Sequence, residues 1–120
     1  MARILLADDD PGSRDFVRRA LETAGHSVLV AEDGADALAK VRSSGPFDVL
    51  LTDVQMPGLD GIALAAGARG VQPGLRIVMM SGYPDVLDRA RATVASPARF
   101  VAKPFSIDLI RGEVRAALAG

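Results

Sequence analysis

Short apolar runs alternate along this 120-residue chain with segments whose apolar positions recur every three or four residues. Continuous apolar runs bounded by polar residues predict buried strands, and the longer spacing predicts amphipathic helices. Five strands are expected, over residues 3–7, 26–31, 47–52, 75–80 and 98–102. Five helices are expected, over residues 13–24, 35–43, 60–68 and 86–94, and after Ser106.

Two of these helices have clear apolar stripes and recognisable ends. The expected inner positions are Phe16, Val17, Ala20, Leu21 and Ala24 in the first helix, and Ile107, Ile110, Val114 and Leu118 in the last. Gly25 is expected to end the first helix in the left-handed conformation, and Ser106 to cap the last. Gly67 and Gly70 each cost about 1 kcal/mol relative to alanine, so the third helix is expected to be short or bent.

Strands that alternate with helices predict β-α-β units and a parallel sheet that is covered on both faces. The near-continuous apolar strands agree, because a strand buried on both faces has no reason to alternate. The predicted fold class is α/β, a three-layer (βα)5 doubly wound sheet formed by right-handed crossovers. Its flavodoxin-like strand order, 2-1-3-4-5, is adopted from known sheets of this kind, since the residue pattern alone does not determine it.

Composition limits the possible functions. Hydrophobic residues make up 49% of the chain and charged residues 24%, which is typical of a globular protein. The chain has no cysteine, no basic block and no apolar run near the ~20 residues that span a bilayer. We therefore expect one domain over residues 1–120 in the cytoplasm, with no DNA and no membrane as partner.

Polar side chains stand where the predicted strands end. Asp8 and Asp9 follow the first strand, Asp53 ends the third, Ser81 follows the fourth and Lys103 follows the fifth. Parallel strands bring their carboxyl ends to one edge, where open sheets of this class place their sites. In the adopted order the first and third strands are neighbours, so the three aspartates are expected to meet.

Three carboxylates in one pocket are tolerable when a hard divalent cation lies among them. Mg²⁺ takes carboxylates, keeps several waters and completes its shell with phosphate oxygens. Lys103 adds a positive charge and Ser81 a hydroxyl donor, and together these groups suit phosphoryl transfer. One of the carboxylates can itself be the nucleophile and form an aspartyl-phosphate.

Each residue alone also has a simpler interpretation. The aspartates after the first strand can be helix caps, which is the preferred interpretation of Asp10. Asp53 alone can start a turn, and Ser81 and Lys103 can be ordinary loop and surface residues. His26 is interpreted as a plain strand-edge residue. The arginines of the first helix, Arg14, Arg18 and Arg19, are interpreted as a solvated face in preference to a surface that docks a partner. The combination at the strand ends is much more specific than its parts.

Four segments, RILLADDD, VLLTDVQMPGLDG, MMSGYP and RFVAKPF, resemble the receiver domains of bacterial two-component response regulators, which have the CheY-like fold. The resemblance implies that Asp53 accepts a phosphoryl group from a phosphohistidine on a sensor histidine kinase or histidine phosphotransfer protein. It implies a Mg²⁺ site formed by Asp8, Asp9, Asp53 and the backbone carbonyl of Gln55. It also implies that Ser81 and Lys103 contact the phosphoryl group and that the Lys103–Pro104 peptide is cis.

The same resemblance implies a conformational switch formed by Ser81 and Phe100. Because Phe100 lacks a hydroxyl, we expect it to prefer a buried position and to respond weakly to phosphorylation. Gln55 and Tyr83 occupy positions that set the lifetime of the aspartyl-phosphate in the family, and Tyr83 is expected to screen attacking water. Pro84 is expected to stiffen the start of the fourth helix.

The expected output is a protein contact, to an unknown downstream protein, through the fourth helix, fifth strand and fifth helix. The motifs are similar to stand-alone receivers that act as protease adaptors and to receivers of hybrid kinases. A different class, haloacid-dehalogenase-like phosphohydrolases, carries a second aspartate where this chain has Gln55. We therefore expect a stand-alone signalling switch with self-catalysed phosphorylation and dephosphorylation, and neither an enzyme nor a receiver that works without phosphate.

Overall fold

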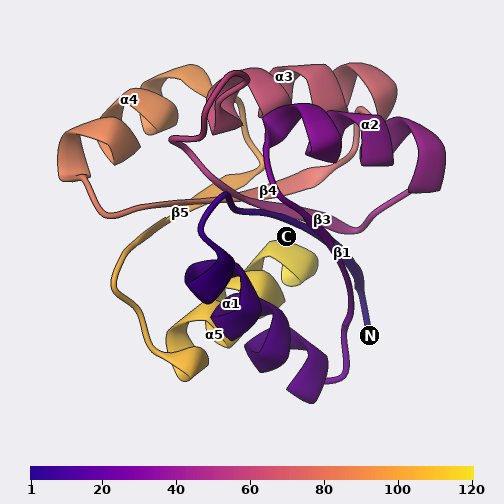
Figure 1. Ribbon diagram of the computed structural model, residues 1–120, viewed down its shortest axis with the longest axis vertical. Coiled ribbons are helices and arrows are strands. Elements are labelled where there is room, and N and C mark those ends of the chain that lie inside the picture. The colour runs from indigo at the N-terminus through magenta and orange to yellow at the C-terminus, as the bar shows by residue number, and fades with distance from the viewer.

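Five parallel strands form the central sheet of the computed structural model, which describes residues 1–120 (Figure 1). They are β1 (Arg3–Ala7), β2 (Ser27–Ala31), β3 (Val49–Asp53), β4 (Arg76–Ser81) and β5 (Ala98–Ala102). The order across the sheet is β2-β1-β3-β4-β5, and every neighbouring pair is parallel. The predicted fold class and the adopted strand order are both confirmed.

Five helices cover the two faces of this sheet. They are α1 (Pro11–Thr23), α2 (Gly34–Ser44), α3 (Gly61–Val71), α4 (Pro84–Thr93) and α5 (Ile107–Ala119). Helices α2, α3 and α4 lie on one face, and α1 and α5 lie on the other (Figure 1). None of the helices is long and apolar enough to cross a bilayer.

Each face of the sheet contributes to its own hydrophobic cluster. Leu5, Leu50 and Ile77 point toward α2, α3 and α4. Their sequence neighbours Ile4 and Leu51 point toward α1 and α5. All five side chains are buried, which explains why the strands lack polar alternation.

Three strands differ from their predicted bounds, and β4 begins and ends one residue later than expected. β2 begins at Ser27, because the His26 backbone N–H donates to the Leu21 carbonyl at the end of α1 (3.1 Å) and not to a neighbouring strand. β3 begins at Val49, two residues after the predicted start at Phe47. Phe47 is buried, but its backbone N–H donates to Oε1 of Gln72 (2.9 Å) and not to a strand.

The predicted cap residues are confirmed, whereas the helices begin or end one to three residues away from their predicted bounds. Asp10 Oδ2 accepts from the Ser13 backbone (3.2 Å) and Ser106 Oγ accepts from the Leu109 backbone (3.0 Å), so both residues cap their helices. Gly25 has a φ of +97°, the conformation expected after the end of α1. Ala24 lies just beyond α1 and is exposed, so its predicted inner position is wrong.

Two other predicted inner positions are also wrong. Phe16 is 41% exposed and Ile107 is 42% exposed. The Phe16 ring faces the ring of Phe105, with centroids 6.5 Å apart, and so packs toward the start of α5 and not onto the sheet. Ile107 occupies the first residue of α5, before the buried stripe of that helix begins at Ile110.

The third helix is longer than expected. α3 continues through Gly67 and Gly70 to Val71. A Cβ at Gly67 would lie 3.2 Å from Cδ1 of Leu38, so this glycine permits close packing of α3 against α2. The packing explains why a glycine is tolerated at a position where helix propensity alone disfavours it.

Candidate functional site

The predicted site residues meet at the carboxyl edge of the sheet. Asp8 directly follows β1, Asp53 is the last residue of β3, Ser81 is the last residue of β4, and Lys103 directly follows β5. They surround a cleft lined by Asp9, Asp53, Gln55, Ser81, Tyr83 and Lys103, among other residues. Asp8 is fully buried next to this cleft.

The three aspartates form one cluster of carboxylate oxygens. One oxygen each from Asp8, Asp9 and Asp53 lies within 4.8 Å of the others. Asp53 is 7% exposed, whereas Asp9 is exposed at the cleft. Oδ2 of Asp8 is buried and accepts no hydrogen bond. A buried carboxylate oxygen that accepts no hydrogen bond, beside two further hard oxygen donors, fits a divalent cation such as Mg²⁺.

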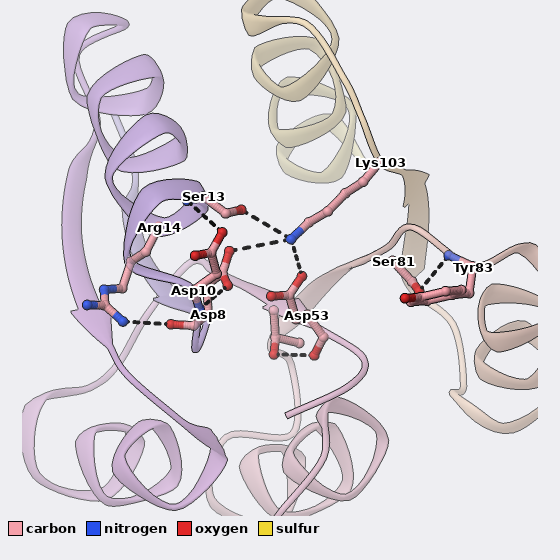
Figure 2. Close-up of polar contacts among 9 residues, drawn as sticks. Asp8, Asp10, Ser13, Arg14, Asp53, Ser81, Tyr83 and Lys103 are labelled. Atoms are coloured by element: carbon pink, nitrogen blue, oxygen red, sulfur yellow. Dashed lines mark hydrogen bonds and ion pairs between the residues drawn. The ribbon is translucent and has the colours of Figure 1, made fainter. Parts of the chain in front are cut away.

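The Lys103 side chain extends toward Asp8 and Asp53 (Figure 2). Its Nζ lies 2.7 Å from Oδ1 of Asp53 and 3.5 Å from Oδ2 of Asp8. The Lys103 backbone N–H donates to the Ser81 carbonyl (2.8 Å), and this hydrogen bond holds the backbone of Lys103 beside the end of β4. The Lys103–Pro104 peptide is cis, as the resemblance implied.

The two buried carboxyls hold protons very differently. Burial, together with the neighbouring Asp8, raises the pKa of Asp53 to about 8 in spite of the Lys103 ammonium. Burial also disfavours the charged form of Asp8, but the neighbouring Asp53 carboxyl and Ser13 hydroxyl, the Asp10 backbone N–H and the Lys103 ammonium together outweigh it and lower the pKa of Asp8. Two neighbouring buried carboxyl groups cannot both ionise freely, so the pair of Asp8 and Asp53 retains a proton on Asp53 near neutral pH.

The three consecutive aspartates have three different environments. Asp8 is buried, Asp9 faces the cleft and Asp10 caps α1. The Asp10 backbone N–H donates to Oδ1 of Asp8 (2.9 Å), and Nη1 of Arg14 donates to the Asp8 carbonyl (2.9 Å). Arg14 therefore supports the site, a role that the interpretation as a solvated face missed.

The other arginines of α1 fit the solvated face. Arg18 forms ion pairs with Asp15 (2.6 Å) and Glu22 (2.7 Å), and Arg19 pairs with Asp15 (2.9 Å). These pairs lie at helical spacing on the surface, where each contributes little to stability.

Ser81 faces the start of α4. Its Oγ accepts a hydrogen bond from the Tyr83 backbone (3.1 Å), and the side chain itself is buried (Figure 2). The Tyr83 side chain is 61% exposed and lines the cleft. A serine held in this way presents its hydroxyl close to the cleft while its backbone carbonyl anchors Lys103.

Phe100 lies on β5, two residues before the strand ends, and is partly buried. The guanidinium of Arg91, on α4, lies over the Phe100 ring at 5.4 Å from its centroid. The predicted switch aromatic is therefore neither fully buried nor free, because a cation covers its outer face.

Comparison with known proteins decides the family. The family model of the response regulator receiver domain matches residues 4–115. The chain belongs to this family. It is 40% identical over 111 residues to the response regulator receiver protein CpdR of Brucella abortus, and the match covers 92% of each chain. It is also 36% identical to the response regulator MprA of Mycobacterium tuberculosis, covering 97% of this chain and 50% of MprA.

Solved receiver structures have the same fold. The receiver domain of the hybrid histidine kinase CckA aligns with a TM-score of 0.82 at 32% identity, covering 97% of this chain and 98% of that one. The response regulator TrrA of Thermotoga maritima aligns with a TM-score of 0.86 at 29% identity, covering 98% and 100%. This receiver domain is thus a phosphoacceptor module of two-component signalling, a class that binds Mg²⁺ at an acidic cluster and has histidine kinases as partners.

Proposed function

We propose that Asp53 is the phosphoacceptor of this receiver domain and takes its phosphoryl group from a phosphohistidine of a histidine kinase or phosphotransfer protein. The observation that carries the proposal is the position of Asp53 in the cleft, 2.7 Å from the Lys103 ammonium and within the aspartate cluster. Asp8 is fully buried, whereas Asp53 lines the cleft, which leaves Asp53 accessible to a donor.

The chain's own groups supply most of what the transfer requires. An oxygen of the Asp53 carboxylate bonds to phosphorus as the bond from phosphorus to the donor's imidazole nitrogen breaks and the imidazole leaves. Lys103 neutralises charge on the phosphoryl oxygens, and the Ser81 hydroxyl donates to one of them. Positioning and charge neutralisation of this kind account for most of the catalysis of phosphoryl transfer.

We assign a Mg²⁺ site to the carboxylates of Asp8, Asp9 and Asp53 and the backbone carbonyl of Gln55. When bound, Mg²⁺ offsets the negative charge of the cluster and of the incoming phosphoryl group. Oδ2 of Asp8, which is buried and accepts no hydrogen bond, supports this assignment. It is also supported by the similar receiver TrrA, whose structure was solved in complex with Mg²⁺ and BeF.

The proposed switch connects the cleft to the surface formed by α4, β5 and α5. Ser81 lies directly before the loop to α4, and Phe100 lies on β5 beneath Arg91. A shift of Ser81 toward a phosphoryl group breaks its hydrogen bond with the Tyr83 backbone and so frees the start of α4. This surface is the proposed contact for the downstream protein, and Gln55 and Tyr83 set the lifetime of the phosphorylated state.

We propose a switch that catalyses its own phosphorylation and dephosphorylation, with residues 1–120 acting as a single receiver domain, and not an enzyme that acts on free substrates. Phosphohydrolases that form an aspartyl-phosphate use a second aspartate as general acid and base. This chain has Gln55 at that position, with no ionisable side chain.

The test incubates the chain with acetyl phosphate and Mg²⁺ and follows intact mass and donor consumption. The proposal predicts one transient phosphoryl adduct per chain, absent in Asp53→Asn and retained in the exposed control Asp108→Asn. Rapid consumption of many donor equivalents without an adduct would show an enzyme and contradict the proposal.

A further inference from the structure

Ser13, on α1, contacts the candidate site from a part of the chain that no site motif includes. Its Oγ accepts a hydrogen bond from Nζ of Lys103 (3.1 Å), 90 residues away in the sequence (Figure 2). The Ser13 side chain is half-buried and lines the same cleft as Asp53.

Helix capping does not explain this side chain. A serine in the first turn of a helix often serves the free backbone N–H groups there. In α1 that role belongs to Asp10, whose carboxylate accepts from the Ser13 backbone (3.2 Å). The Ser13 hydroxyl is therefore available to the lysine.

The three acceptors around the Lys103 ammonium are not equivalent. An ammonium group has three donors, and here they face Asp53, Asp8 and the hydroxyl of Ser13. The two carboxylates belong to the proposed metal and phosphoryl site, so other ligands compete for them. The Ser13 hydroxyl is neutral and outside that ligand set.

We infer that Ser13 is a positioning residue that holds the Lys103 ammonium over the Asp53 carboxylate while the carboxylates engage their other ligands. A lysine side chain has many rotamers to lose, so an acceptor that restrains it raises the fraction of time spent in the productive position. This inference rests on the proposed function, because it gives Lys103 its role in phosphoryl transfer.

The test compares rates of phosphorylation by acetyl phosphate at saturating Mg²⁺, measured by intact mass as a function of donor concentration. Ser13→Ala is expected to lower the maximal rate about fivefold. This factor corresponds to losing part of the free energy of one hydrogen bond to a charged group. Ser13→Thr retains the hydroxyl and is expected to restore most of the rate, whereas the equally shaped Ser13→Val is not. Ser43→Ala, on the exposed surface of α2, is the control for a serine away from the cleft.

A double variant distinguishes positioning from a general structural role. If Ser13 acts through the lysine, Ser13→Ala combined with Lys103→Met is no slower than Lys103→Met alone. Three outcomes would overturn this inference but leave the proposed function intact. They are a wild-type rate in Ser13→Ala, equal rates in the threonine and valine variants, and a double variant slower than Lys103→Met. No adduct on the wild-type chain would instead overturn the proposed function, and this inference with it.

Discussion

The ammonium of Lys103 lies 2.7 Å from the carboxylate of Asp53, although β4 lies between β3, which ends at Asp53, and β5, which Lys103 follows. The contact is possible because the Lys103 backbone is hydrogen-bonded to the carbonyl of Ser81, at the end of the intervening strand. The side chain then spans the end of β4 and reaches the carboxylate on the far side. The ends of β3, β4 and β5 thus together position the ammonium of Lys103 beside the carboxylate of Asp53.

Lys103→Met is expected to slow phosphorylation by acetyl phosphate about 100-fold, because it removes the positive charge that faces the phosphoryl group. The control is Lys40→Met, since Lys40 is the other lysine of the chain and pairs with Asp36 on α2 (2.9 Å). Time courses of intact mass would measure both rates. Equal rates for the two variants would show that the lysine beside Asp53 has no role in the transfer.

Mg²⁺ affinity is expected to rise with pH up to about 8, the pKa of Asp53. Below that pH the carboxyl carries a proton that the metal must displace, so affinity increases up to about tenfold per pH unit and levels off above it. Tyr83 is the only tyrosine in a chain without tryptophan and lines the cleft, so its fluorescence reports the titration. The dependence should be absent in Asp53→Asn, and a flat profile between about pH 6 and 8 in the wild type would contradict the proton placement.

Two glycines of α3 are expected to respond to alanine in opposite directions. A Cβ at Gly61 would lie 2.2 Å from the carbonyl oxygen of Asp53, so Gly61→Ala must displace the backbone of the phosphoacceptor. We expect a loss of about 2 kcal/mol in the free energy of unfolding and slower phosphorylation. No atom lies within 4 Å of a Cβ at Gly70, so Gly70→Ala is expected to stabilise the chain by up to about 1 kcal/mol. Urea unfolding measures both, and equal effects would contradict the assigned close approach.

Arg91 is expected to restrain the Phe100 ring. A guanidinium over an aromatic face contributes about 0.5–1 kcal/mol at a partly exposed position, so Arg91→Ala should shift the ring toward other rotamers two- to fivefold. Ring chemical shifts of labelled phenylalanine, with and without beryllofluoride and Mg²⁺, would measure this. Asp88→Ala removes the 3.2 Å ion pair of Arg91 but keeps the ring contact, and should change little. If the aspartate variant had the larger effect, the cation–ring contact would not be the restraint.

The strand ends were predictable because their chemistry is local to the sequence. Asp53, Ser81 and Lys103 each end or follow an apolar run, and a parallel sheet necessarily gathers such positions at one edge. The strand order itself was adopted from known sheets, and the register of β1 and β3, with Ala7 opposite Thr52, brings Asp8 beside Asp53.

Other features depend on packing that no periodicity describes. The hydrogen bond from Lys103 to Ser13 joins residues 90 positions apart and follows from the path of one side chain. The exposure of Phe16 could not be predicted either, because helical spacing defines a stripe but not where the sheet beneath it ends. The glycine at position 67 of α3 lies close to Leu38 of α2, and this contact between helices is not visible in the periodicity.

The most direct test of the central claim is to locate the phosphoryl group within the phosphorylated chain. Borohydride reduction converts an acyl phosphate to an alcohol, and peptide mass spectrometry then identifies the modified residue. The account predicts reduction at Asp53 alone after incubation with acetyl phosphate and Mg²⁺. Modification at Asp8 or Asp9, or at no aspartate of the cluster, would contradict it.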